Sequence, residues 1–185
     1  YGLLDKDTEL SRDDFLPNVL TACEYDGKLA ILPQTFTLQT VIGKADDVGT
    51  TPGWTVSDMK ALIASKPEGT QLFWGMDRTS ALTALMSLGY NDFINWEDAS
   101  CNFDSQEFID VLDFANMFPE EFEYRDDMED STVLLSQGKQ LLDTYYLSDF
   151  EQVQMYRAIF GGPTTFIGYP TSEGNGAMLL SLIHI

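Results

Sequence analysis

Residues 28–49 read KLAILPQTFTLQTVIGKADDVG, and this stretch decides the fold of the chain. The first run, Leu29 to Leu32, is continuously apolar, which predicts a strand buried on both faces. The second run, Thr35 to Ile42, is rich in Thr, Val and Ile and predicts another strand. Pro33 between them has no backbone N–H for a sheet ladder, so it marks an edge, a bulge or a crossing point. Strand statistics alone fit a plain hairpin or sheet edge as well as they fit a crossing point.

The flanking sequence alternates helical and strand patterns, which predicts an α/β unit. Capping pairs mark three helix starts, at Ser11 with Asp14, Thr55 with Asp58, and Asp104 with Glu107. The helices predicted from periodicity include residues 12–24, 78–88 and 149–160, the second ending at Gly89, and the short strands predicted between helices are residues 71–74, 139–142 and 164–168. In such units ligands gather at the carboxyl ends of the strands.

Composition excludes several classes of function. The 185 residues are 44% hydrophobic, enough for one core or one and a half domains, and the formal net charge is -20. Such an acidic chain lacks the clustered Lys and Arg that phosphate backbones and anionic membranes require. The acidic segment Glu120–Asp130 is interpreted as a solvated surface, with a metal site as the less favoured alternative.

Motifs for catalysis and cofactor binding are missing from the sequence. The single histidine, His184, has no Ser-His-Asp or Cys-His context, and no Gly-rich nucleotide motif occurs. Cys23 and Cys101 lie far apart without a CxxC pair, so two buried free thiols are favoured over a disulfide. We therefore expect no cofactor, no metal and no catalytic residue.

A longer segment around the opening stretch carries a family resemblance. TACEYDGKLAILPQTFTLQTVIGKADDVG followed by PGWTVSDMKALIASKPEG resembles the hinge of family 1 extracellular solute-binding proteins, which serve ABC importers, usually of carbohydrates. That family has F-x-Y-D-G-K-L-Y-x-L-P where the chain crosses between lobes, then T-W-D-E at a helix start. Here Ala30 replaces the Tyr, and the helix opens with Trp54 and Thr55. The similarity continues through GKQLLDTYYLSDF, where Leu142 replaces the usual Met, and TTFIGYPTSEGNG, so it covers nearly the whole chain.

The resemblance implies an α/β, two-lobe periplasmic-binding-protein-like fold of type II, similar to that of maltose-binding proteins. The chain would be a fragment that holds most of the second lobe and both hinge crossings. The expected parts are the last portion of the first lobe with the hinge strand (1–36), the second lobe (37–165) and the return crossing (166–177). Residues 178–185 read MLLSLIHI, which resembles a translated adapter sequence, and they are expected to be a non-native tail.

A sugar site needs aromatic faces for C–H surfaces and short polar groups for hydroxyls. Three strand ends offer both kinds of side chain, and the predicted ligand-binding residues are Phe36, Thr37, Trp74, Asp77, Arg78, Tyr145, Tyr146 and Ser148. By the resemblance, Thr37 matches the hinge contact, residues 77–79 the helix-start contact, and the two tyrosines the aromatic platform. Each has a structural alternative: Asp77 can cap the next helix, one tyrosine can point into the core, and Trp74 can fill the core.

The function implied is that of a non-enzymatic extracellular or periplasmic receptor. Two hinged lobes would close around a small-molecule solute, expected to be a saccharide, and deliver it to the permease subunits of an ABC transporter. The receptor would be a monomer that binds no nucleic acid, anchored by an N-terminal lipoprotein segment that this sequence lacks. Two alternatives stay open: a glycoside hydrolase, for which only Asp77 and Asp143 offer a carboxylate pair, and a surface adhesion or peptide-binding module.

Overall fold

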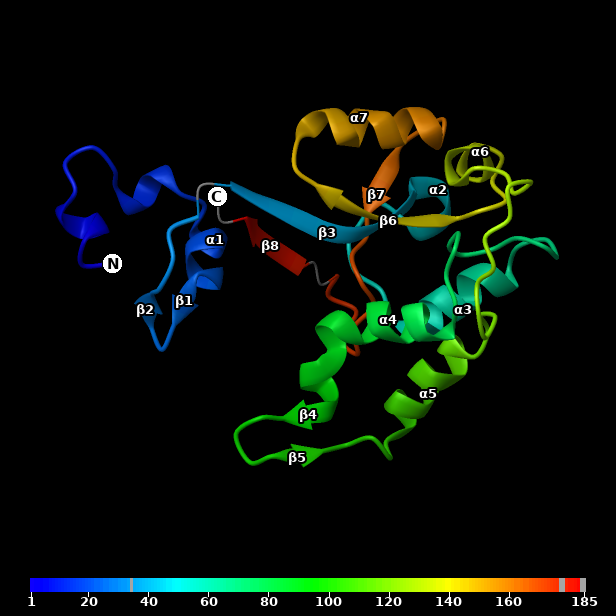
Figure 1. Ribbon diagram of the computed structural model, residues 1–185, viewed down its shortest axis with the longest axis horizontal. Helices are drawn as coiled ribbons and strands as arrows, with labels where there is room; N and C mark the ends of the chain where they lie inside the picture. The colour runs from blue at the N-terminus through cyan, green and yellow to red at the C-terminus, as the bar shows by residue number, and fades with distance from the viewer. Residues whose placement is uncertain (34, 177–178, 184–185) are drawn as a thin grey trace. The chain divides into compact units, whose positions relative to one another are not determined.

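The chain is seen here in a computed structural model (Figure 1). The structure describes residues 1–33, 35–176 and 179–183, with backbone only for 87–91 and 179–183, so His184 lies outside the described residues. The chain divides into two compact units, one of Tyr1–Leu38 with Leu180–Ile185 and the other of Gln39–Leu179. Each unit is described by itself.

The first unit begins with short elements. They are two 3₁₀ turns, η1 (Leu4–Lys6) and η2 (Arg12–Asp14), the helix α1 (Pro17–Ala22), and the antiparallel hairpin of β1 (Glu24–Tyr25) and β2 (Lys28–Leu29). The hairpin turns at Asp26 and Gly27, both with positive φ, as a two-residue connection of this twist requires.

Two sequence predictions for this unit are wrong. The predicted helix over residues 12–24 is split, because Ser11 and Asp14 close a separate turn and Pro17 starts α1 at its first position. The predicted strand Leu29–Leu32 is reduced to its first residue within β2, and Ile31 and Leu32 are 37% and 42% exposed. A continuous apolar run therefore did not indicate burial here.

A β-sheet forms the centre of the second unit. Strand β3 (Thr35–Lys44) lies between β6 (Leu142–Leu147) and β7 (Thr164–Phe166), and β8 (Leu179–Ile183) also pairs with β3. The β3–β7 pair is antiparallel, with Ile42 opposite Phe166. The segment predicted as a strand over 71–74 makes only one parallel bridge, from Gln71 to Gln140. The backbone N–H of Leu142 also donates to the carbonyl oxygen of Leu72 (2.9 Å).

Helices surround this sheet. They are α2 (Ala45–Val48), α3 (Val56–Ala64), α4 (Arg78–Phe93), α5 (Gln106–Ala115), α6 (Ser131–Ser136) and α7 (Phe150–Ile159), with the hairpin β4 (Ile94–Asn95) and β5 (Ser100–Cys101) between α4 and α5. The capping box of Thr55 and Asp58 at α3 is confirmed. The predicted stop of α4 at Gly89 is wrong, since the helix continues to Phe93. At α5 the N-cap is Ser105, one residue after the predicted Asp104.

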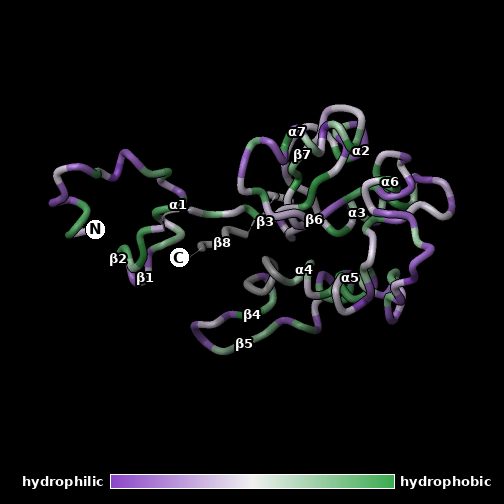
Figure 2. The backbone as a smooth tube through the Cα atoms, turned by 45° about the horizontal axis from the view of Figure 1, so that its top comes forward, coloured by the Kyte–Doolittle hydropathy of each residue, from purple (hydrophilic) through white to green (hydrophobic). Residues whose placement is uncertain are grey.

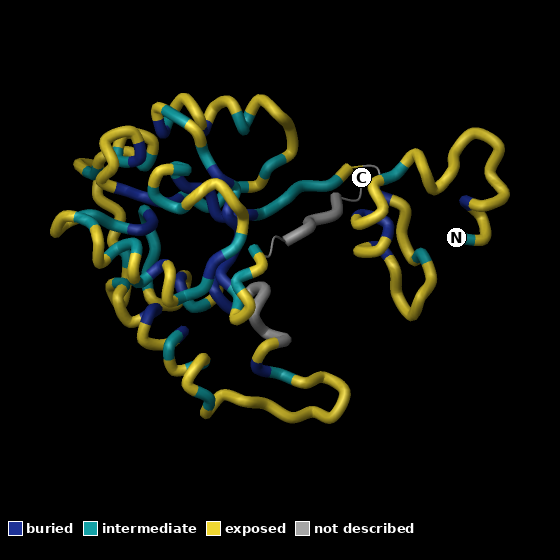
Figure 3. The backbone as a smooth tube through the Cα atoms, turned by 180° about the vertical axis from the view of Figure 1, so that it is seen from behind, coloured by how far each residue is buried: buried dark blue, intermediate teal, exposed yellow. Residues whose placement is uncertain are grey.

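The core of the second unit lies between the sheet and its helices. Figure 3 shows the buried positions in the strands and on the inward sides of the helices, and Figure 2 shows that the loop between α5 and α6 is largely hydrophilic. One cluster includes Val41, Phe114 and Leu142, and a smaller one includes Ile42 and Tyr156. Among the described residues, no helix is long and apolar enough to cross a membrane.

Trp54 joins the start of α3 to the strand region after β7. Its side chain is 5% exposed, and Nε1 donates to the carbonyl oxygen of Gly168 (2.8 Å). Beside it, Gly53 has φ +111, and a Cβ there would lie 2.2 Å from the carbonyl oxygen of Gly174. Only glycine permits both this conformation and this approach. Trp54 is thus a structural residue that fixes the start of α3.

Both cysteines are free thiols, which confirms that prediction. Cys23 is buried, whereas Cys101 lies exposed in the β4–β5 hairpin, so its predicted burial is wrong.

Candidate functional site

A pocket of about 340 Å³ in the second unit gathers neutral polar side chains. It is bounded by β3, the start of α4, β6 and the segment after β7, and its lining residues are Gln39, Met76, Thr79, Ser80, Thr83, Ala84, Thr144 and Tyr169. None of these eight side chains carries a formal charge at neutral pH. Gln39 and Thr144 lie within β3 and β6, so the pocket forms where the middle of these two strands meets the start of α4, and not at the strand ends where the sequence predicted a site.

The first turns of α4 supply three of the pocket's five hydroxyl groups, those of Thr79, Ser80 and Thr83. Thr79 and Thr83 stand four residues apart, as do Ser80 and Ala84, so these pairs share one side of the helix. Asp77 fixes the helix start, because its Oδ1 accepts the backbone N–H of Ser80 (2.7 Å). Hydrogen bonds with Ser80 hold the pKa of Asp77 below its ordinary value. The structural alternative for Asp77, an N-cap, is therefore what the geometry shows.

Tyr169 contributes a phenol to the lining of the pocket. Its side chain is 2% exposed and hydrogen-bonded with Gln39. Burial raises the pKa of Tyr169 to about 12, nearby Tyr146 adds to the rise, and the bond with Gln39 partly offsets it. The hydroxyl is therefore neutral at physiological pH, and a neutral phenol can both donate and accept a hydrogen bond.

Strand β6 separates its two tyrosines. The ring of Tyr145 packs edge-on against Tyr156 (centroids 5.2 Å apart), while Tyr146 is 55% exposed and close enough to affect the pKa of Tyr169. Side chains alternate along a strand, which explains the separation. Of these two tyrosines, only Tyr146 can therefore offer its aromatic face to a ligand. This agrees with the prediction that one of the two points into the core.

Asp143 fixes the position of β6 beside the pocket through two hydrogen bonds. Its Oδ2 accepts the hydroxyl of Tyr156 (2.7 Å), and its Oδ1 accepts the backbone N–H of Thr144 (2.9 Å). Burial raises the pKa of Asp143, and these hydrogen bonds lower it in part. Burial, together with the bond to Asp143, also raises the pKa of Tyr156. The pair therefore holds Thr144 at the pocket through the backbone.

Other predicted residues have partners outside the pocket. Trp74 Nε1 donates to the carbonyl oxygen of Glu129 (3.2 Å), and Arg78 Nε donates to that of Phe118 (3.2 Å). Ser148 pairs with the start of α7, where its N–H donates to Gln152 Oε1 (2.7 Å). The two hinge residues that were predicted, Phe36 and Thr37, are half-buried in the part of β3 that belongs to the first unit.

Sequence reasoning missed several pocket residues. Gln39, Met76, Thr83, Thr144 and Tyr169 were not among the predicted ligand-binding residues. The i, i+4 spacing from Thr79 to Thr83 was a readable signal. Tyr169 carried none, because its place depends on a return crossing more than 120 residues after Gln39.

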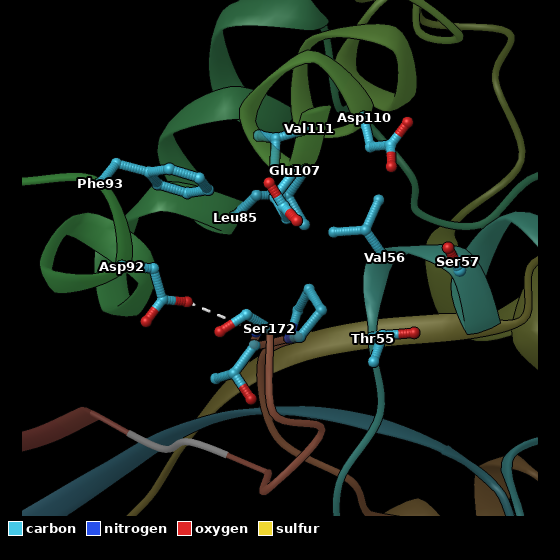
Figure 4. Close-up of a pocket in the computed structure, with 12 residues that line it drawn as sticks. Thr55, Val56, Ser57, Leu85, Asp92, Phe93, Glu107, Asp110, Val111 and Ser172 are labelled. Atoms are coloured by element: carbon cyan, nitrogen blue, oxygen red, sulfur yellow. Dashed lines mark hydrogen bonds between the residues drawn. The ribbon is translucent and has the colours of Figure 1, made fainter. Parts of the chain in front are cut away.

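A second pocket, of about 210 Å³, lies between α3, α4 and α5 and shares no lining residue with the first (Figure 4). Its walls combine the carboxylates of Asp92, Glu107 and Asp110 with apolar side chains such as Val111. Asp92 Oδ2 accepts the backbone N–H of Ser172 (3.4 Å). This pocket therefore carries three carboxylates in its lining, whereas the first pocket carries none.

Comparison with solved structures identifies the class of fold. The sugar-binding protein MalE from the phytopathogen Xanthomonas citri superposes with a TM-score of 0.60 at 16% identity, over 98% of this chain and 51% of that one. An ABC substrate-binding protein from Listeria monocytogenes in complex with cycloalternan gives 0.53 at 13% identity, over 97% and 48%. An ABC transporter solute-binding protein from Agrobacterium vitis with bound D-mannitol gives 0.52 at 18%, over 98% and 49%.

The chain thus has the α/β fold of two-lobe solute-binding proteins and spans about half the length of these structures, which confirms the predicted fold class. The similar structures are binding proteins for sugars and related solutes. No family model matches the sequence, and no curated protein matches it.

Proposed function

We propose that this chain is part of an extracellular or periplasmic receptor that captures a sugar or oligosaccharide and delivers it to the permease of an ABC importer. The observation that carries the proposal is the uncharged, hydroxyl-rich pocket where β3 and β6 meet the start of α4. The receptor acts as a monomer without enzymatic activity and is held at the membrane by a lipoprotein segment. The fold shared with sugar-binding ABC proteins supports this function.

The lining chemistry favours a neutral polyol over a charged solute. Five hydroxyls and the Gln39 amide offer both donors and acceptors, and no Lys, Arg, Asp or Glu lines the pocket. Met76 and Ala84 supply apolar surface for the C–H faces of a sugar ring. A carboxylate or phosphate solute would need a cation that these eight side chains do not provide.

The remaining parts of the receptor follow from this assignment. Residues 1–36 belong to the first lobe, 37–165 to the second, and 166–177 return the chain to the first. Phe36 and Thr37 contribute from the hinge, Tyr146 gives the aromatic face, and a bound sugar closes the lobes because it makes better contacts in the closed state.

A melting experiment on the full-length protein tests this function. Mono- and oligosaccharides are screened by thermal shift, and a binder at 100 times its dissociation constant adds about 2.7 kcal/mol to the free energy of unfolding. Tyr169→Phe should lower the affinity for the sugar that binds by about two- to tenfold, which corresponds to the loss of one hydrogen bond. Tyr25→Phe, which removes the hydroxyl of a side chain 81% exposed, is the matched control. A protein that no saccharide stabilises would refute the proposal.

The hydrolase alternative has weaker support in the geometry. Asp77 caps α4 and Asp143 is engaged by Tyr156 and Thr144, so neither of these carboxylates is presented for acid–base chemistry. Analysis of the bound sugar after incubation distinguishes the two functions, because a receptor returns it unchanged and a hydrolase does not.

A further inference from the structure

The second pocket, between α3, α4 and α5, has an apolar floor that belongs to the core. Leu85, Phe93 and Val111 line it, and all three side chains are buried members of the larger core cluster. Val56 and Pro170 add apolar surface from the start of α3 and from the segment after β7. Because core packing holds these side chains in place, the floor is a preformed surface for an apolar group.

The charge of the lining is negative and uncompensated. Asp92, Glu107 and Asp110 line the pocket, and no Lys, Arg or His does. In Figure 4 the carboxylates of Asp92 and Glu107 face the middle of the pocket, whereas that of Asp110 points away from it. None of the three takes part in the five ion pairs found among the described residues. The two inward carboxylates therefore favour a positively charged occupant.

An organic cation fits this pocket better than a metal ion does. Within the described part of the chain, no group of three or more His, Cys, Asp or Glu side chains is placed to hold a metal ion. A metal ion would also leave the apolar floor uncovered, whereas an ammonium group on an apolar body matches both parts of the lining. The volume of about 210 Å³ lies below the about 300–1,000 Å³ typical of pockets for drug-sized ligands, so the cation is a small one.

We propose that this pocket is a separate binding site for a small primary amine. The apolar body of the amine lies on Leu85, Phe93 and Val111, and its ammonium group donates charge-assisted hydrogen bonds to Glu107 and Asp92. The inference does not depend on the proposed sugar-binding function, because the two pockets share no lining residue. The protein therefore binds an amine whether or not a saccharide is present.

Calorimetric titration of the full-length protein with 2-phenylethylamine tests the site. Two analogues each lack one feature of this probe: 2-phenylethanol has a hydroxyl in place of the ammonium group, and methylamine has no apolar body. The probe should bind saturably, one molecule per chain, and each analogue should bind at least about tenfold more weakly.

A pair of variants separates the pocket from the general charge of the protein. Glu107→Gln should lower the affinity for 2-phenylethylamine by about three- to tenfold. Asp113→Asn, on an exposed residue of α5 outside the pocket, should leave the affinity unchanged. Both variants remove one negative charge from a chain of formal net charge -20, so they weaken any non-specific attraction of cations equally.

Each other outcome overturns the inference. An equal loss of affinity in Glu107→Gln and Asp113→Asn would show that the amine follows the general field of the protein. Equal binding of 2-phenylethylamine and methylamine would show that the apolar floor is not used. Absence of amine binding would remove the site and leave the sugar-receptor function, which the saccharide screen tests separately.

Asp92→Asn is the second variant if Glu107→Gln fails to fold. It keeps an acceptor for the backbone N–H of Ser172 and removes only the charge, so the fold should be retained while the affinity for 2-phenylethylamine falls by a similar factor. An unchanged affinity in this variant would contradict the assigned place of the ammonium group.

Discussion

The hydrogen bond between Tyr156 and Asp143 should make the stability of this protein depend on pH in a defined way. Tyr156 is 1% exposed, and its hydroxyl donates to Asp143 Oδ2 at 2.7 Å. Tyr156→Phe removes this hydroxyl. The half-buried Asp143 carboxylate then keeps the hydrogen bond from the backbone N–H of Thr144 and loses the one from Tyr156. We expect the variant to be destabilised more at neutral pH than at acid pH.

The sign follows from the pKa of Asp143, which burial raises above the ordinary value of 3.8. Because the folded state resists ionisation of this group, it contributes most stability below pH 3.8 and loses it as pH rises through the raised pKa. The Tyr156 hydroxyl opposes that loss, since its bond lowers the pKa of Asp143. Removing it should cost about 1.5–3 kcal/mol at pH 7, where the carboxylate is charged, and about 0.5–1.5 kcal/mol at pH 3, where it is neutral.

Urea unfolding of the full-length protein, followed by tryptophan fluorescence between pH 3 and pH 7, measures the effect. The wild type and Tyr25→Phe serve as references, and the double variant Asp143→Asn with Tyr156→Phe should abolish the extra pH dependence. An equal loss of stability at pH 3 and pH 7 would refute the reasoning, because it would show that lost packing, and not the charged hydrogen bond, dominates.

Three further predictions follow from the described contacts. Gly53→Ala should abolish the folded state or lower the melting temperature by many degrees, because its Cβ would meet the carbonyl oxygen of Gly174. Gly49→Ala, at φ +82 and ψ -178 with nothing within 4 Å of the added Cβ, should cost about 1–3 kcal/mol of backbone strain and a smaller fall in melting temperature in the same experiment. Asp77→Ala should lower the melting temperature above pH 4 but not at pH 2, since the cap bond holds the pKa of Asp77 below its ordinary value and its contribution disappears as pH falls through that lowered pKa; identical shifts at both pH values would contradict this. A maleimide should label Cys101 quickly and Cys23 slowly in the native protein, because Cys23 is buried and burial raises its pKa, and peptide mass spectrometry that finds equal labelling would contradict the assigned exposure.

Much of the fold could be read from local signals. The β-branched run from Thr35 onward predicted β3, and the Thr55–Asp58 pair predicted the start of α3, because both depend on near neighbours in sequence. Signals failed where tertiary contacts decided the outcome. Ile31 and Leu32 are apolar yet exposed, and Gly89 lies inside α4 although an isolated glycine after a helical pattern usually ends it.

The candidate site was predictable only in part for the same reason. The α4 start was located from local pattern, and the alternation rule correctly separated Tyr145 from Tyr146. The strand predicted over 139–142 instead runs from Leu142 to Leu147, which places Thr144 inside the strand and not after it. Gln39 and Tyr169 meet through pairing of segments distant in sequence, so no local motif marks them. Trp74 was predicted as a ligand on chemical type, and its aromatic neighbours in the acidic loop appear only in the folded chain.

The strand order β6-β3-β7 has a consequence for synthesis of the chain. β3 is made first, yet β6 and β7, which flank it, begin at Leu142 and Thr164, about a hundred residues later. A nascent or truncated chain that stops before Thr164 presents one edge of β3 unpaired and leaves the Trp54 indole without the Gly168 carbonyl. Unpaired strand edges recruit other chains, so the interval before β7 emerges from the ribosome is when this protein is most exposed to aggregation and most dependent on chaperones.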